Sequence, residues 1–222
     1  MVWDTALQLA KTKKFLKCKY ASEVPGWTST LQHSQYIKLI EQLPDKPKIL
    51  EIGCGYGRST WAWLDVIPKN TDYYILDNFN LHFNDNFKTG FTAWRSFTTP
   101  KQNRKFTQRV RDNKFTQREI FDRIITRHAK YNNIKEIWHM SGDTWVESKF
   151  FDKEWDLVYL DDDHSYNSVK KWLEIFSNVP IVCGDDYNTT WQGVISAVDE
   201  YTHKTNSSLQ IMPANFFVIK NT

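Results

Sequence analysis

Three glycines at alternate positions, Gly53, Gly55 and Gly57, stand between a short apolar run and a segment with helical periodicity. Glycine allows a sharp backbone turn and lets the main chain approach a ligand without a Cβ clash. The helix that follows offers N–H groups to an anionic ligand group. Residues 48–66 are therefore predicted to form a strand, a ligand-binding loop and a helix.

The spacing of the glycines does not fit the dinucleotide-binding fingerprint G-x-G-x-x-G. The third glycine comes one residue early, and Arg58 stands where that fingerprint requires glycine. The loop thus indicates a ligand other than a nicotinamide dinucleotide.

Short apolar runs alternate with helical segments along the rest of the chain. Because the runs are apolar on both faces, they indicate a mainly parallel sheet of the α/β class, covered on both sides. The predicted strands are 48–52, 73–76, 134–140, 157–160, 181–183, 209–212 and 216–220. The predicted helices are 5–16, 31–43, 58–66, 168–176 and 193–201. The last two strands are too close for a crossover helix and should pair antiparallel.

Acidic side chains follow several of the predicted strands. They are Asp77, then Asp161, Asp162 and Asp163 with His164, then Asp185 and Asp186. In open parallel sheets, ligands bind at the carboxyl ends of the strands, and neighbouring strands lie about 4.8 Å apart. If the last two groups follow adjacent strands, their carboxylates repel one another and a divalent cation relieves the repulsion. Oxygen ligands suit Mg²⁺, whereas His164 would suit softer metals.

The form Glu-x-Gly-x-Gly-x-Gly of residues 51–57 resembles the first motif of class I methyltransferases that use S-adenosylmethionine (SAM). Within that class the chain is most similar to the macrocin-type sugar O-methyltransferases. The similar stretches are 26–27, 57–60, 161–166, 184–187, 193–194 and 197–199. Asp162 departs from the pattern, since glycine is more common there.

This resemblance implies a Rossmann-like class I methyltransferase fold. It implies a mostly parallel seven-stranded sheet with an antiparallel last strand and helices on both faces. The chain is long enough for one domain, residues 1–222, with N-terminal helices predicted at about 1–45. The segment at about 78–133 is too long for a single connection and is predicted to be a basic helical insertion or lid. The implied activity is SAM-dependent, Mg²⁺-dependent transfer of a methyl group to a hydroxyl of a sugar, a glycan or a similar small molecule.

The resemblance also implies roles for individual residues. Asp77 would accept hydrogen bonds from the ribose hydroxyls, a role for which a carboxylate is suited. The implied SAM-binding residues are Glu51, Gly53, Gly55, Tyr56, Gly57, Ser59, Thr60, Asp77, Ser141, Gly142, Asp143 and Asp161. Asp161, Asp185 and Asp186 would bind the metal. Asp163 would be the general base, with His164 as the alternative because imidazole titrates near neutral pH. Each acidic residue could instead cap a turn or a helix.

The predicted insertion is strongly basic. Residues 101–130 carry ten basic and three acidic side chains, so their net charge is +7 and that of the rest is 3 − 7 = −4. This pattern is typical of a solvated helical face, or of a lid that attracts an anionic substrate such as a nucleotide-sugar, a phosphorylated glycan or RNA. A nucleic-acid methyltransferase that uses this basic segment is therefore one alternative function. A non-catalytic SAM-binding protein is another.

The cysteines indicate the compartment. Cys18, Cys54 and Cys183 are widely spaced and odd in number, which argues against a disulfide framework and fits a reducing environment. The N-terminus does not resemble a signal peptide, and no apolar run is long enough to span a membrane. We expect a cytoplasmic protein without a membrane partner. Assembly through N-terminal helices, as in many relatives, would give a homo-oligomer.

Overall fold

The structure, a computed structural model, describes residues 24, 26, 28–79, 116–139 and 153–221. These residues fall into two compact units. The described part of the first unit comprises 24, 26, 28–37, 55–67, 79 and 116–132, and that of the second comprises 38–54, 68–78, 133–139 and 153–221. The single-domain prediction stays a prediction.

The second unit contains a seven-stranded sheet. Its strands are β1 (Lys48–Ile52), β2 (Asp72–Asp77), β3 (Ile134–His139), β4 (Leu157–Leu160), β5 (Ile181–Gly184), β6 (Ser208–Met212) and β7 (Phe216–Lys220). Their order across the sheet is β3-β2-β1-β4-β5-β7-β6. The strands β1 to β5 pair in parallel, while β7 runs antiparallel to both of its neighbours. The predicted α/β fold class, with its reversed last strand, is confirmed.

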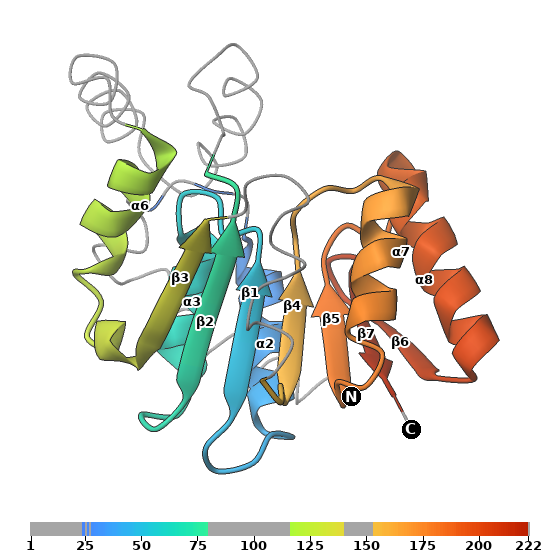
Figure 1. Cartoon of the computed structure of the whole chain (residues 1–222), viewed down its shortest axis with the longest axis horizontal. Helices are drawn as coiled ribbons and strands as arrows, with labels where there is room; N and C mark the ends of the chain where they lie inside the picture. The colour runs from blue at the N-terminus through green and yellow to red at the C-terminus, as the bar shows by residue number, and fades with distance from the viewer. Residues whose placement is uncertain (1–23, 25, 27, 80–115, 140–152, 222) are drawn as a thin grey trace. The chain divides into compact units, whose positions relative to one another are not determined.

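The register of the central strands brings four strand ends into one row. Ile52 of β1 pairs with Leu76 of β2 and with Leu160 of β4, and Leu160 pairs with Gly184 of β5. The arrowheads of these strands point to the same edge of the sheet (Figure 1). The residues that follow each strand therefore meet at that edge.

Two helices cover one face of this sheet, α7 (Tyr166–Ile175) and α8 (Gln192–Thr205), which lie side by side (Figure 1). Alternate strand residues such as Leu50, Val158 and Val182 pack with Trp172 and Val198 of the helices in one hydrophobic core. A short 3₁₀ helix, η4 (Thr189–Trp191), leads directly into α8.

The first unit is helical. It contains α3 (Arg58–Val66), α6 (Gln117–Ile125) and most of α2 (Thr30–Ile40). Tyr36 and Trp63 stack inside it with ring centroids 4.0 Å apart. Another 3₁₀ turn, η2 (Tyr131–Asn133), precedes β3.

The predicted element boundaries need small corrections. The helix predicted over 31–43 ends at Ile40, because the N–H groups of Gln42 and Leu43 donate to carbonyls three residues back in a tighter turn. The helix predicted from Ser168 begins at Tyr166, since the Ser165 side chain caps it. The predicted helix 5–16, residue Met140 and the insertion up to residue 115 lie outside the described residues.

Candidate active site

The glycine loop is tied to the end of β2. The backbone N–H of Gly53 donates to the carbonyl of Leu76 at 2.9 Å, and the N–H of Cys54 donates to Oδ2 of Asp77 at 2.7 Å. Asp77 thus fixes the start of the loop in addition to its implied contact with SAM. A carboxylate has lone pairs for several donors, so the two roles are compatible.

Gly53 is required by the fold itself. Its φ is +85°, and a Cβ atom there would lie 2.1 Å from the carbonyl oxygen of Asp161. The start of the loop passes so close to the end of β4 that no side chain fits between them. The packing of the loop against the end of β4 therefore requires glycine at position 53, independently of any contact with SAM.

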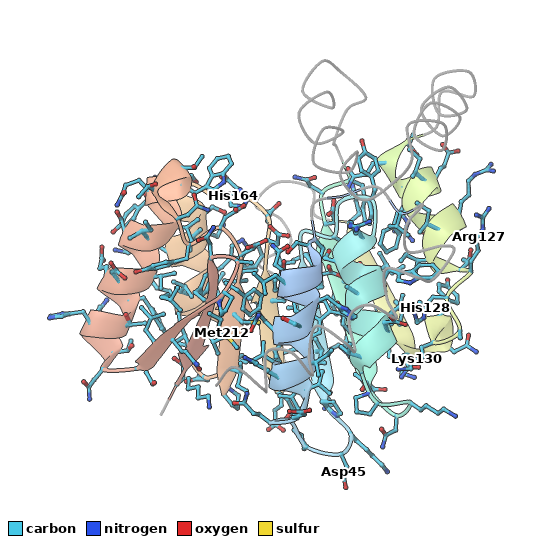
Figure 2. All side chains as sticks on the ribbon, turned by 180° about the vertical axis from the view of Figure 1, so that it is seen from behind. Asp45, Arg127, His128, Lys130, His164 and Met212 are labelled. Atoms are coloured by element: carbon cyan, nitrogen blue, oxygen red, sulfur yellow. The ribbon has the colours of Figure 1, made fainter. Side chains whose placement is uncertain are left out.

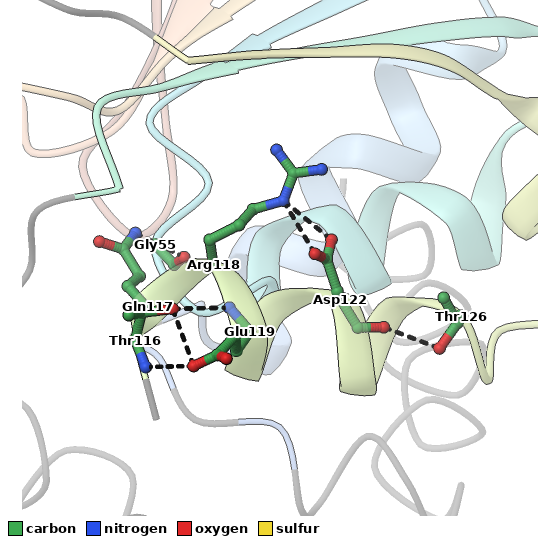
Figure 3. A network of polar contacts seen from close by, with 7 residues as sticks. All are labelled: Gly55, Thr116, Gln117, Arg118, Glu119, Asp122 and Thr126. Carbon is green, nitrogen blue, oxygen red and sulfur yellow. Dashed lines mark hydrogen bonds and ion pairs between the residues drawn. The ribbon is translucent and has the colours of Figure 1, made fainter. Parts of the chain in front are cut away.

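In the first unit, the rest of the loop is supported by α6. Gln117 donates from Nε2 to the carbonyl oxygen of Gly55 at 2.8 Å (Figure 3). Gly57 has φ +95° and is the N-cap of α3, and a Cβ atom there would lie 3.0 Å from Phe121 and Ile125 of α6. A capping box between Thr116 and Glu119 fixes the first turn of α6.

Several residues implied to bind SAM are buried. Glu51 is fully buried and accepts a hydrogen bond from the Tyr73 hydroxyl at 3.0 Å. Tyr56, Ser59 and Thr60 are also buried. Ser141, Gly142 and Asp143 lie outside the described residues.

Arg58, which breaks the dinucleotide pattern, is buried in the first unit. Its guanidinium donates to the carbonyls of Thr28 and Val24 at 2.8 and 2.9 Å. Burial lowers its pKa to about 10. This side chain holds the segment before α2 in place.

The acidic residues of β4 and β5 meet in the second unit around one histidine. Nε2 of His164 lies 2.9 Å from Oδ2 of Asp186 and 3.6 Å from Oδ1 of Asp161. One ligand atom of each of these three residues lies within 4.8 Å of the other two. The contacts are ion-pair contacts, since Nε2 makes no well-aligned hydrogen bond. Figure 2 labels His164 at the edge where the strands end, with Asp45 at the opposite edge.

Asp186 adopts an unusual backbone conformation. Its φ is +62°, in the left-handed region that aspartate tolerates better than most residues. Its N–H donates to Oδ1 of Asp185 at 2.7 Å, and its carbonyl accepts the N–H of Asn188 at 2.7 Å. The turn after β5 thus holds Asp186 beside His164, while Asp185 lies outside the three-residue group.

Asp163, the implied general base, is an exposed turn residue. Its Oδ1 accepts the N–H of Ser165 at 3.0 Å, and its Oδ2 accepts the Ser165 hydroxyl at 2.8 Å. The alternative turn role therefore operates at this position, and the base role stays a prediction.

Burial, and after it the charge of neighbouring carboxylates, raises the pKa values of the acidic groups at this cluster. Burial, aided by the charges of Asp161 and Asp186, raises the pKa of Asp185 to about 8. Burial and the charge of Asp77 raise that of Asp162 to about 6. Burial opposes charge on His164, but Asp161 and Asp186 raise its pKa to about 10. These buried carboxyl groups therefore ionise less readily than exposed ones, and a positive charge beside them would favour their charged form.

A small cavity of about 20 Å³ lies beside these groups. That volume is enough for about one water molecule. Its polar lining comes from Asp161, Asp162, Asp163, His164 and Asp185, and its apolar lining from Leu160, Val169, Trp172, Val194 and Phe217.

Two aromatic residues at this cluster were not singled out from the sequence. The Tyr159 hydroxyl donates to Oδ2 of Asp161 at 3.0 Å. The Trp191 ring stacks on the His164 ring, with centroids 4.5 Å apart. The available signals were the position of Tyr159 in β4, two residues before Asp161, and that of Trp191, two residues before Gly193. Neither indicates a site by itself.

The family described as "Methyltransferase domain" matches residues 50–187 of the 222. The chain belongs to this family, and SAM-dependent methyl transfer is its activity. No curated protein matches the chain at a significant level. The macrocin-type sugar subgroup is a finer assignment than this match gives.

Solved structures agree on the fold. The O-methyltransferase TomG from Streptomyces achromogenes, in complex with SAM, has a TM-score of 0.52 at 11% identity, over 97% of this chain and 90% of that chain. Cofactor-bound Rv0187 from MTB has a TM-score of 0.54 at 14% identity, over 96% and 88%. A cyclopropane-fatty-acyl-phospholipid synthase-like protein from Lactobacillus casei has a TM-score of 0.53 at 13% identity, over 89% and 77%. At these identities the likeness concerns the fold alone.

The residues present fit both implied ligands. Left-handed glycines at 53, 55 and 57 give the loop a shape that other residues rarely adopt. Two carboxylates and an imidazole within 4.8 Å of one another form a donor set for a divalent cation. Because the imidazole is a nitrogen donor, the set suits Mn²⁺ or a similar ion as well as Mg²⁺.

Among the described residues, no helix is long and apolar enough to cross a membrane.

Proposed function

We propose that the chain transfers the methyl group of SAM to a hydroxyl of a sugar or similar polyol, with a divalent cation at the cluster of Asp161, His164 and Asp186. The observation that carries this proposal is the meeting of these three side chains at the carboxyl ends of β4 and β5. That edge is also where the glycine loop leaves β1 and where Asp77 ends β2.

Different residues would bind SAM, hold the cation and accept the proton. Gly53 and Asp77 set the start of the SAM-binding loop. Asp161, His164 and Asp186 would hold the cation, which would lower the pKa of an acceptor hydroxyl. Asp185, which lies outside this group, stays a predicted ligand. The acceptor oxygen attacks the sulfonium methyl group, the C–S bond breaks, and S-adenosylhomocysteine (SAH) leaves. The hydroxyl proton passes to a base, which is the carboxylate of Asp163 or, alternatively, the neutral imidazole of His164.

A nucleic-acid acceptor is the alternative. Of its basic segment, the described part is residues 116–130, where Arg118 pairs with Asp122 at 2.9 Å and Lys130 donates to the carbonyls of Asp65 and Ile67. These cations serve the protein's own structure. The carboxylate cluster also repels phosphates, so the sugar hydroxyl is the better supported acceptor.

The test compares two carboxylate variants. Asp186→Asn removes one charge from the cluster, and Asp45→Asn removes one from an exposed position at the opposite edge of the sheet. Isothermal titration should give the same SAM affinity for both variants and the wild type. Binding of Mn²⁺ and Mg²⁺, and methyl transfer to a glycan panel, should fall at least about tenfold in Asp186→Asn alone. Wild-type metal binding in Asp186→Asn would contradict the metal role.

A further inference from the structure

One exposed aromatic side chain lies directly at the acidic cluster. Among the described residues, the large apolar side chains that stay exposed are Tyr131, Trp191 and Ile211. Trp191 is 42% exposed, and its ring lies on the His164 ring at an interplanar angle of 27°. Part of the indole is therefore open to solvent directly beside the acidic cluster.

The backbone around Trp191 holds it there. Its N–H donates to the carbonyl of Asn188 at 2.9 Å, and the Asn188 side chain accepts the N–H of Thr190. Two residues later, a Cβ atom on Gly193 would lie 2.6 Å from the carbonyl oxygen of His164. The turn is therefore packed tightly against the His164 segment, and the indole is positioned before any ligand arrives.

The surroundings of the indole restrict what it binds. An exposed aromatic face favours a flat, partly apolar partner. In the metal-free chain, the carboxylates of Asp161 and Asp186 accept hydrogen bonds and repel anions, so they favour a neutral partner with hydroxyl groups. The neighbouring Thr189, Thr190 and Gln192 are exposed and polar. A neutral sugar ring has both an apolar C–H face and hydroxyls at its rim.

We propose that Trp191 is an acceptor-binding residue: the C–H face of a neutral pyranose ring stacks on the part of its indole that His164 leaves exposed, at the edge of the acidic cluster. This inference rests on the proposed function and gives it a residue that selects ring-shaped acceptors. An acyclic polyol has similar hydroxyl groups but no flat face to stack on the indole. A uronate has the flat face, but its carboxylate is repelled by Asp161 and Asp186.

The experiment measures saccharide binding to the metal-free full chain with SAH by saturation-transfer NMR. The probes are methyl α-D-glucopyranoside, sorbitol, glucuronate and 4-methylcatechol. The proteins are the wild type, Trp191→Ala, Trp191→Phe and the control Tyr131→Ala, which removes another exposed ring outside the cluster. SAH affinity and melting temperature are measured for each, so that a folding defect is recognised.

We expect the wild type to bind the pyranoside more tightly than sorbitol or glucuronate. Trp191→Ala should weaken pyranoside binding about tenfold, while Trp191→Phe stays within about threefold of the wild type. Tyr131→Ala should bind as the wild type does, and all four proteins should bind SAH equally. Rescue by phenylalanine distinguishes stacking from a general structural role.

Three results would overturn the inference: no pyranoside binding by the wild type, equal pyranoside binding by Trp191→Ala, or binding of the catechol in place of the pyranoside. If the wild type binds SAH while Trp191→Ala keeps its pyranoside affinity, only the role of Trp191 fails. If the wild type binds no SAH, the proposed function fails with it.

Discussion

Nε2 of His164 lies 2.9 Å from Oδ2 of Asp186. The backbone of Asp186 is in the left-handed region. The same nitrogen is 3.6 Å from Oδ1 of Asp161, which follows a different strand. Without a metal, a protonated imidazole supplies the positive charge between two carboxylates, since its pKa is raised to about 10. A bound cation would supply that charge instead.

The imidazole should influence which metal binds. Because His164 adds a nitrogen donor to two carboxylates, His164→Gln should weaken Mn²⁺ binding at least about tenfold and Mg²⁺ binding less than about threefold. Isothermal titration with each chloride salt measures both. His203→Gln changes an exposed histidine of α8 and should leave both affinities unchanged. Equal metal affinities in His164→Gln and the wild type would exclude His164 as a ligand.

Gly53 is predicted to stabilise the fold even when SAM is absent. In Gly53→Ala, the new Cβ atom would lie 2.1 Å from the carbonyl oxygen of Asp161, and φ would stay at +85° or the loop would shift. We expect a loss of more than about 2 kcal/mol in unfolding free energy, measured by urea denaturation without SAM. Unchanged stability together with weaker SAM binding would show that the glycine serves the ligand alone.

Gln117 should act through the glycine loop. Gln117 and Gly55 are drawn together in Figure 3. In Gln117→Ala, the carbonyl of Gly55 loses the donor that lies 2.8 Å away, so we expect the loop to become less ordered. We expect a stability loss of about 1 kcal/mol and about three- to tenfold weaker SAH binding. Arg118→Ala is the matched control, because its pair with Asp122 is exposed on the same helix and should be worth less than about 0.5 kcal/mol. Equal SAH affinity in the two variants would show that Gln117 does not affect SAH binding through the glycine loop.

Much of the sheet could be predicted from the sequence because its signals are local. Apolar runs, glycines and aspartates fix where β1, β2, β4 and β5 end, and the parallel register then brings these ends into one row. The helix α3 begins and ends where its periodicity predicts. Such features depend on residues near one another in the chain.

The details of the site depend on contacts that local patterns do not encode. The sequence does not indicate that Asp163 is bonded to Ser165, or that His164 lies between two carboxylates, because both depend on side-chain directions after β4. The stacking of Trp191 on His164 joins residues 27 positions apart. Gly53 was predicted for its ligand, whereas its close approach to Asp161 is a packing requirement between strands.

A buried histidine of the first unit should make stability depend on pH. His33 is 2% exposed, and burial lowers its pKa to about 4, although the charge of Asp65 opposes the shift and that of Arg58 adds to it. In the unfolded chain its pKa is about 6.5. The unfolded state therefore binds a proton between these two values while the folded state does not. The contribution of neutral His33 to the free energy of unfolding is therefore complete above about pH 6.5 and is lost as the pH falls toward 4.

The size of this loss follows from the shift. Between pH 7.5 and 4.5 the contribution of His33 should fall by about 2–3 kcal/mol. Urea unfolding at both pH values measures the change for the wild type, for His33→Gln, which cannot titrate in this range, and for His203→Gln, whose histidine stays in solvent. His33→Gln should be less stable at pH 7.5 but lose about 2–3 kcal/mol less on acidification, while His203→Gln should follow the wild type. Parallel pH profiles for all three proteins would mean that His33 becomes charged within the folded state as readily as in water.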